Sequence, residues 1–119
     1  MSENPVIDEF GSQRWLKDHK YHREDGPALI RWDGTERWFI DGKKHRVGGP
    51  ACTKADGTKY WYQHGRLHRT DGPAIIGSDN RLWWYIQNIR IHSWSTYQQL
   101  AKLSDEELAF LILKYGEIT

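Results

Sequence analysis

Aromatic, polar and glycine positions recur along the chain with a fixed step of 23 residues. The clearest column is formed by tryptophans, namely Trp15, Trp38, Trp61 and Trp84. Short strand-like runs separate clusters of turn-forming residues at the same spacing. A constant period of this size is typical of a repeat architecture, in which each unit is one small supersecondary element.

A seven-residue motif recurs at the same step. His22-Arg23-Glu24-Asp25-Gly26-Pro27-Ala28 returns as residues 45–51 and again as residues 68–74. A fourth copy, residues 78–92, lacks the Gly-Pro-Ala ending, as expected of a terminal repeat that another element caps. We therefore expect four β repeats over residues 1–92.

Each repeat contains two turn signals. Asp-Gly, or a substitute for it, is the strongest two-residue hairpin signal. The first turn is Asp33-Gly34 or Asp56-Gly57, and the second is Asp41-Gly42, His64-Gly65 or Gln87-Asn88. The Gly-Pro pairs mark a bend or a sheet edge, because proline cannot donate to a ladder. The pattern predicts an antiparallel meander of short strands with no helix inside it.

Two-residue turns would also fix the register. Trp38 would face Leu29 across one turn and His45 across the other, and Trp61 would likewise face Cys52 and His68. One face would then carry the tryptophans. The other face would carry the candidate binding residues, which are Arg37, Arg46, Tyr60, Tyr62, Arg69, Trp83 and Tyr85. A slip of one residue would exchange the faces.

The period changes after His92. Residues 94–101 show helical spacing, with Ser93 or Ser95 as the cap, and Ser104-Asp105-Glu106-Glu107 is a capping box that opens a second helix. Gly116 fits the end of that helix. We expect residues 93–119 to form a helical cap of the same domain that closes the last sheet edge. The expected fold class is mainly β, an antiparallel meander with a C-terminal α-helical cap.

Composition limits the functional classes. The chain has 119 residues, which suits one domain, and a net charge of +1, which gives no overall attraction to nucleic acid or membrane. The single Cys52 excludes an internal disulfide. Since the start of the chain is neither basic nor apolar, and no apolar run could span a bilayer, we expect a cytoplasmic protein without membrane association.

The stretch Gly34-Thr35-Glu36-Arg37-Trp38-Phe39-Ile40-Asp41-Gly42-Lys43-Lys44-His45 resembles the MORN repeat, whose unit contains Gly, an aromatic residue, Trp, Asn/Asp-Gly-Lys and His. The resemblance covers residues 6–92. Arg46 and Arg69 stand where that family has Gly, a variant similar to repeats in uncharacterised bacterial and bacteriophage proteins. The resemblance implies the repeat architecture. For function it implies a scaffold, a partner-binding sheet or occasional lipid contact.

The repeated histidines are better explained by structure than by metal binding. Successive copies would lie about 10 Å apart at about 4.8 Å per strand, whereas zinc ligands lie about 2 Å from one ion. No spacing places a catalytic triad, a carboxylate pair or a phosphate loop. We therefore expect no metal site, no cofactor and no enzymatic activity, and a buried, inert Cys52.

The arginines and aromatics leave alternatives open. Arg23 and Arg69 could pair with Asp25 and Asp71, whereas Arg46 has Gly48 at that position and is less committed. The basic and aromatic surface could anchor a protein partner or stack bases. It could equally be core covered by the C-terminal helices.

Two functional hypotheses follow. The first is a non-enzymatic protein-binding module, which the phage resemblance would make a bacteriophage-encoded inhibitor or modulator of a host protein. The alternative is sequestration of a nucleotide or short nucleic acid on the Arg/aromatic face. Because no element precedes the first strand, we also expect a homodimer, formed through the N-terminal edge at residues 6–17 or through the uncovered face.

Overall fold

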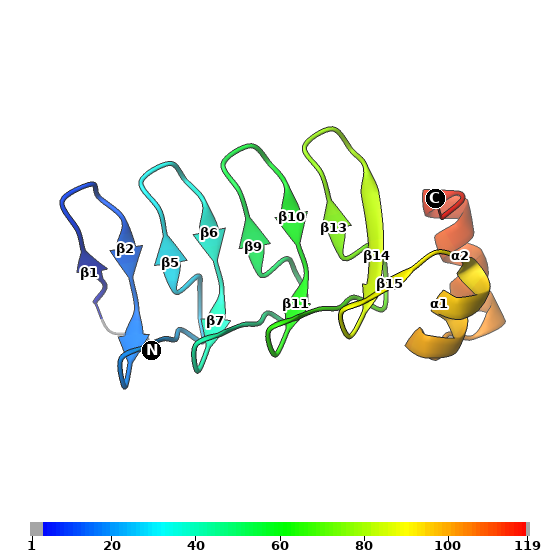
Figure 1. The fold of residues 1–119 in the computed structure, drawn as a ribbon, viewed down its shortest axis with the longest axis horizontal. Coiled ribbons are helices and arrows are strands. Elements are labelled where there is room, and N and C mark those ends of the chain that lie inside the picture. Colours follow the sequence, from blue (N-terminus) through cyan, green and yellow to red (C-terminus); the bar gives the residue numbers. More distant parts are fainter. Residues whose placement is uncertain (1–3, 119) are drawn as a thin grey trace.

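The described residues, 4–118 of the computed structural model, form a row of β-hairpins that ends in two helices (Figure 1). The main sheet runs in the order β1 (Val6–Ile7), β2 (Gln13–Arg14), β5 (Leu29–Ile30), β6 (Glu36–Arg37), β9 (Cys52–Thr53), β10 (Lys59–Tyr60), β13 (Ile75–Ile76), β14 (Leu82–Ile86) and β15 (Ile89–Ile91). All neighbours are antiparallel. The predicted fold class, a β meander with a helical C-terminal region, is confirmed.

A second, smaller hairpin follows the first in each of the first three repeats. These hairpins are β3 (Leu16–Lys17) with β4 (Lys20–Tyr21), β7 (Phe39–Ile40) with β8 (Lys43–Lys44), and β11 (Tyr62–Gln63) with β12 (Arg66–Leu67). Their turns have two residues with positive φ, as in Asp41 at 48° and Gly42 at 79°. This pattern is that of a type I′ turn. The register predicted here is correct, and the His45 N–H donates to the Trp38 carbonyl at 3.1 Å.

The first hairpin of each repeat has a different register from the predicted one. Leu29 lies opposite Arg37, not opposite Trp38. The Arg31 N–H bonds the Thr35 carbonyl and the Gly34 N–H bonds the Arg31 carbonyl, so the loop has three residues. A three-residue loop is a type I turn followed by a left-handed residue, and Gly34 has φ 93°. The same difference puts Cys52 opposite Tyr60 rather than Trp61.

The tryptophans lie where the two hairpins of a repeat join. The Trp38 N–H donates to the Ala51 carbonyl at 2.6 Å, and Trp61 makes the same bond to Ala74. Both alanines have 0% of their surface exposed, so these positions have no space for a larger side chain. The position after Gly-Pro is therefore restricted to alanine, because the next strand lies close to it.

Hydroxyl side chains join successive repeats at the first turns. The Ser12 Oγ accepts the N–H of Trp32 at 2.9 Å, and the Thr35 Oγ1 accepts the N–H of Ala55 at 3.2 Å. Both hydroxyls are buried, so each bond satisfies a polar group that would otherwise be costly. This column, one step of 23 residues, was not recognised in the sequence.

Helices α1 (Trp94–Ala101) and α2 (Asp105–Tyr115) pack against the end of the sheet. Ser93 caps α1, and the predicted capping box of Ser104 and Glu107 opens α2. Trp84 is 2% exposed and lies at the centre of this core, with its ring 4.8 Å from Trp94 and 4.9 Å from Tyr97. Within residues 4–118, neither helix is both long enough and apolar enough to cross a bilayer.

Candidate binding face

One face of the sheet carries most of the predicted binding residues. The register places four columns on it, which we call the aromatic face: 14/37/60/83, 6/29/52/75, 16/39/62/85 and 21/44/67/90. Ring contacts there join hairpins within one repeat and between successive repeats. Tyr60 and Tyr62 lie 6.3 Å apart, and Tyr21 stacks on Phe39 at 4.9 Å. The face is thus a continuous surface of rings, aliphatic groups and cations.

The C-terminal helices leave most of this face uncovered. In the continuous strand β14, Trp84 points away from Trp83 and Tyr85, because successive side chains alternate. The helices pack on the Trp84 side and beyond the last hairpin, so the core that they form contains neither Tyr60 nor Tyr62. The interpretation that the helices bury these aromatics is wrong, because the short helices cover only the last repeat.

Arg46 and Arg69 do not belong to the aromatic face. Their guanidinium carbons lie 3.9 and 4.0 Å from the ring centroids of Trp38 and Trp61. Each donates to the proline carbonyl four residues on, at 3.2 Å for Arg46 and 3.0 Å for Arg69. The sequence grouped them with Arg37 by strand alternation, but Arg46 and Arg69 lie beyond the ends of β8 and β12, where the chain leaves the hairpin and the side chains stack on the tryptophans. We call their side the Trp face.

The arginines of the Trp face have extensive interactions. Arg23 and Arg69 donate from Nε to Asp25 and Asp71, as predicted. Arg46 has no such carboxylate two residues on, but its stacking on Trp38 and its bond to Pro50 hold it. These contacts fix the guanidinium groups within their own repeats.

The histidines have a structural role in the repeat. The Nδ1 atoms of His22, His45 and His68 accept the backbone N–H of a residue nineteen positions on, at 3.0, 3.0 and 3.1 Å. Each imidazole therefore joins its repeat to the second turn of the next one. Among the described residues there is no group of three or more His, Cys, Asp or Glu that could hold a metal ion.

Arg37 differs from the arginines of the Trp face in its hydrogen bonding. It lies between Leu29 and Cys52 in the register, and its Nε is buried without a hydrogen-bond partner among the described residues. Arg14, one repeat earlier in the same column, has a buried Nε in the same state, although its NH2 group pairs with Asp8 at 3.3 Å. The aromatic face thus holds cationic donors that the fold leaves unsatisfied.

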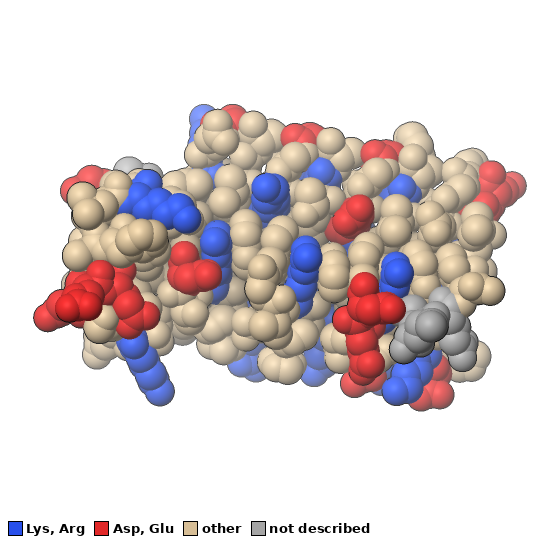
Figure 2. All heavy atoms as spheres, turned by 180° about the vertical axis from the view of Figure 1, so that it is seen from behind, with Lys and Arg blue, Asp and Glu red and all other residues tan. Residues whose placement is uncertain are grey.

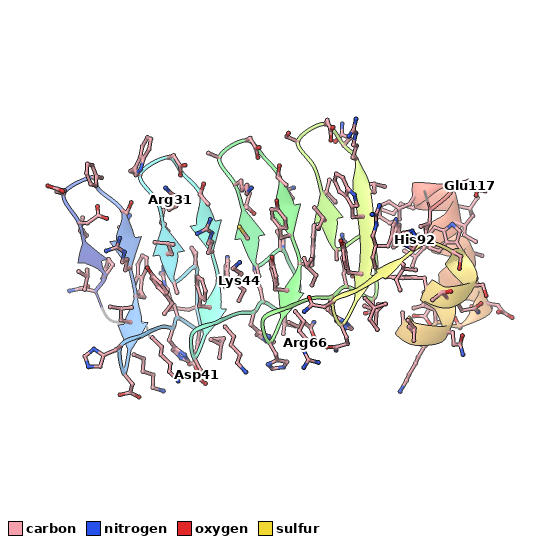
Figure 3. All side chains as sticks on the ribbon, in the orientation of Figure 1. Arg31, Asp41, Lys44, Arg66, His92 and Glu117 are labelled. Carbon is pink, nitrogen blue, oxygen red and sulfur yellow. The ribbon has the colours of Figure 1, made fainter. Side chains whose placement is uncertain are left out.

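Tyr62 lies in the middle of this face. Burial, together with the nearby Cys52 and Tyr60, raises the pKa of its phenol, while Arg37 acts in the opposite direction. The Nζ of Lys44, labelled in Figure 3, lies 4.8 Å from the Tyr62 ring centroid and links two repeats. Cys52 is buried beneath this region, as predicted, but against the aromatic face rather than Trp61.

Two hollows indent the aromatic face. The first, of about 420 Å³, lies over the first two repeats, and we call it the arginine hollow. Its basic and aromatic lining comes from Arg14, Arg31, Arg37, Phe10, Tyr21 and Trp32. The second, of about 380 Å³, lies over the last two repeats and is lined by Tyr60, Trp83, Tyr85 and their neighbours. Of the predicted residues, Arg37 lines the first hollow, and Tyr60, Trp83 and Tyr85 line the second, whereas Tyr62 lines neither.

Phe10, Arg31 and Trp32 were missed as candidates in the sequence. Phe10 and Trp32 depart from their columns in the repeat: Trp32 corresponds to Ala55 and Ser78, and Phe10 corresponds to Asp33. Residues that break a repeat are not needed to build it. That departure is the signal that could have identified this hollow.

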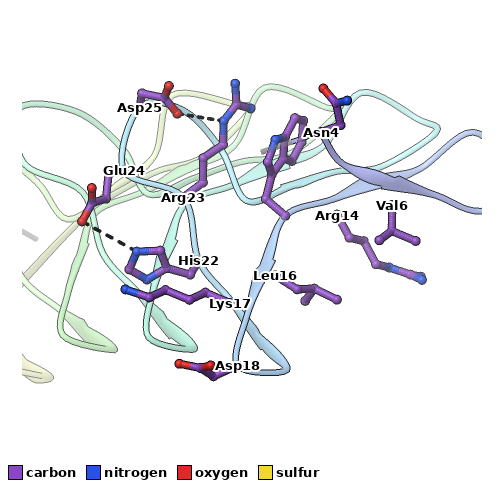
Figure 4. Close-up of a pocket in the computed structure, with 11 residues that line it drawn as sticks. Asn4, Val6, Arg14, Leu16, Lys17, Asp18, His22, Arg23, Glu24 and Asp25 are labelled. Carbon is purple, nitrogen blue, oxygen red and sulfur yellow. Dashed lines mark hydrogen bonds and ion pairs between the residues drawn. The ribbon is translucent and has the colours of Figure 1, made fainter. Parts of the chain in front are cut away.

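A further hollow lies at the N-terminal end of the row (Figure 4). It has a volume of about 560 Å³ and lies where a preceding repeat would stand. Its charged groups are partly paired, with Arg23 bonded to Asp25 and the His22 Nε2 lying 3.7 Å from Glu24.

From behind the view of Figure 1, basic side chains recur at regular intervals with acidic ones between them (Figure 2).

Comparisons of the chain with protein-family models, with curated proteins and with solved structures found no match. The resemblance to the MORN repeat therefore stays a prediction from the residues.

Proposed function

We propose that this chain is a non-enzymatic protein-binding module that uses its aromatic face to hold a partner. The observation that supports it is that the tryptophan and arginine columns of the Trp face stay constant between repeats, whereas the columns of the aromatic face vary. Residues that are identical in successive repeats, such as Trp38 and Trp61 or Arg46 and Arg69, lie on the Trp face and bond to one another. They build the scaffold.

The aromatic face carries residues that differ between repeats. Its first column reads Arg14, Arg37, Tyr60 and Trp83. A column that maintained the scaffold would hold the same residue each time, as the tryptophan column does. Tyrosine, tryptophan and arginine are also the residues that contribute most at protein interfaces. The variable columns of the aromatic face are therefore suited to selecting a partner, and the constant tryptophan and arginine columns to holding the sheet.

We expect the module to act by occupying a surface of its partner. A flat row of hairpins offers an extended surface rather than a reaction chamber, and binding there would block or reposition a surface of the partner. The phage origin that the resemblance implies would make the partner a host protein, whose activity the module would inhibit or modulate.

The test is a capture experiment with a stability-matched control. Immobilised wild-type protein should retain one host protein reproducibly, and the double variant Tyr60→Ser, Tyr62→Ser should lose it. Because these rings are half-buried, the control is Ala51→Val, which destabilises the scaffold but leaves the aromatic face intact. Equal loss by both variants, or no retained protein, would contradict the proposal.

The nucleotide alternative is separated by a second measurement. A nucleotide bound to the face should add more than about 1 kcal/mol to the free energy of unfolding at saturating concentration. It should also lose affinity steeply as salt is raised. A shift of that size with a nucleotide, together with no captured protein, would favour the alternative.

A further inference from the structure

The arginine hollow is lined by three arginines and one carboxylate, and both oxygens of that carboxylate already have partners. Arg14, Arg31 and Arg37 line it, and Asp8 is the acidic residue among its lining groups. The Asp8 Oδ1 accepts the N–H groups of Phe10 and Ser12 at 2.9 and 3.0 Å, and its Oδ2 lies 3.3 Å from Arg14. The hollow therefore has excess positive charge that its own acid does not neutralise.

Two arginines of this hollow have an Nε atom that no group within residues 4–118 accepts from, unlike Arg69 on the Trp face. Arg69 on the Trp face bonds Asp71 and Pro73, whereas the Nε atoms of Arg14 and Arg37 are buried and make no bond within the part of the chain that the structure describes. A buried donor on a charged group is costly when it has no acceptor. The planar guanidinium matches an oxyanion, since it can donate two parallel hydrogen bonds. An oxyanion in the hollow would offset this positive charge and would face the guanidinium groups that line it.

Aromatic rings stand at the rim of the same hollow. Phe10 is 70% exposed and Trp32 is 65% exposed, and both lie in first turns, where the backbone holds them beside the arginines. Arg31, labelled in Figure 3, precedes Trp32 in the β5–β6 turn. Large exposed rings next to cations are suited to stacking on a flat ligand.

The size of the hollow limits the ligand. Its volume of about 420 Å³ falls within the range of about 300 to 1,000 Å³ that small-molecule sites occupy. We propose that the arginine hollow binds a small organic anion in which a phosphate or carboxylate is joined to a flat ring. The oxyanion contacts Arg14 and Arg37, and the ring stacks on Trp32. This inference does not depend on the protein-binding proposal.

The test follows the Nε–Hε signals of the arginines by nuclear magnetic resonance in the intact protein. Phenyl phosphate is the probe, with inorganic phosphate and benzyl alcohol as its two halves. Saturable shifts of the Arg14 and Arg37 signals with phenyl phosphate are expected, together with much weaker binding of either half. Inorganic phosphate binding as tightly as phenyl phosphate would overturn the proposed ligand class.

Variants locate the effect. Arg37→Gln should weaken phenyl phosphate binding about tenfold to a hundredfold, as expected for loss of a charge-assisted hydrogen bond. Trp32→Ala should also weaken it. The matched control is Arg90→Gln, an exposed arginine in β15 on the same face but at the other end of the row, which should bind as wild type does. Equal weakening by Arg37→Gln and Arg90→Gln would indicate diffuse attraction and contradict the site.

Two further measurements keep the result decisive. Amide spectra establish that each variant is folded. If Arg37→Gln is misfolded, Arg37→Lys replaces it. Lysine keeps the positive charge but lacks the planar guanidinium that donates two parallel hydrogen bonds, so Arg37→Lys should bind phenyl phosphate more weakly than wild type. The peptide acetyl-Asp-Phe-amide tests a protein-borne carboxylate. Tighter binding of that peptide than of phenyl phosphate would assign the hollow to a protein partner and overturn the small-molecule proposal.

Discussion

His45 and His68 each act as a hydrogen-bond acceptor, which favours one protonation state. The Nδ1 of His45 accepts the His64 N–H, and that of His68 accepts the Gln87 N–H. A protonated imidazole has no acceptor nitrogen. Burial lowers the pKa of both side chains from the ordinary value of 6.5, and His64 adds to the effect at His45. The two groups therefore favour the neutral form when the chain is folded.

The free energy of unfolding should fall as the pH is lowered. In the unfolded chain these histidines take up protons near their ordinary pKa of 6.5, whereas in the folded chain they do so only at lower pH. Their contribution is therefore complete above about pH 6.5 and is lost progressively below it. Urea unfolding at a series of pH values should show this slope, and the double variant His45→Gln, His68→Gln should flatten it. An unchanged slope would contradict the role of these imidazoles.

The glycine of each Gly-Pro pair provides space for an arginine. A Cβ on Gly72 would lie 2.6 Å from the Cζ of Arg69, so Gly72→Ala should displace the guanidinium from Trp61. We expect a loss of about 1–2 kcal/mol in the free energy of unfolding. In the double variant with Arg69→Ala, the added cost of Gly72→Ala should largely disappear. Purely additive costs in chemical denaturation would refute this explanation.

At the scale of elements, loop length determined which predictions held. Type I′ turns such as Asp41-Gly42 were predicted correctly, because both of their residues have positive φ. Asp33-Gly34 has the same letters, but only Gly34 has positive φ, and Trp32 joins the loop. The dipeptide alone does not distinguish a two-residue loop from a three-residue loop. The resulting shift of one residue moved Leu29 and Cys52 to the aromatic face.

The helical cap should depend on Trp84. Its ring lies at the centre of the only described cluster that joins the helices to the sheet, with edge contacts to Trp94, Tyr97 and Tyr115. Trp84→Ala should cost roughly 3–5 kcal/mol, enough to release or unfold the cap. Trp32→Ala is the control, because that ring is mostly exposed. Thermal melting should fall strongly for the first variant and hardly for the second; comparable melting would show that the cap packs otherwise.

At the scale of the whole molecule, the two ends of the row differ. The C-terminal end is covered by α1 and α2, whereas the described sheet ends at β1 with exposed Val6 and Ile7. Each later repeat pairs its first strand with the repeat before it, as β5 does with β2. An edge with unpaired backbone groups is a template for another strand, and an antiparallel pairing of β1 with its own copy has two-fold symmetry.

We therefore predict a homodimer through β1. Light scattering should give twice the chain mass of 14.1 kDa, and Ile7→Lys should reduce it to the monomer mass. Ile89→Lys is the control, because Ile89 is exposed in β15 at the opposite end. A monomer mass for the wild-type protein, or a dimer that survives Ile7→Lys, would exclude this edge as the interface.

The sequence predicted the architecture more fully than the site. The repeat, the second-turn register, the helices and the helix caps all followed from local signals such as Gly42 and Ser104. The site required knowledge of which side chains share a face, which depends on a single residue in a loop. Identifying the site also required knowing which arginines lack hydrogen-bond partners among the described residues. Arg37 and Arg46 are the same type of residue, and only their tertiary contacts distinguish them. Such surroundings are set by tertiary packing.

The hydroxyl and imidazole bonds described above join each repeat to the next one along the chain, as Ser12 and His22 do for the first repeat. In such an array, one unit can open without opening those further along. Since the C-terminal unit alone is packed against helices within residues 4–118, amide protons of the monomeric Ile7→Lys variant should exchange fastest in β1 and β2 and slowest in β14. The molecule would then lose its order by fraying from one end, and a partner seated over the first repeats would suppress that fraying.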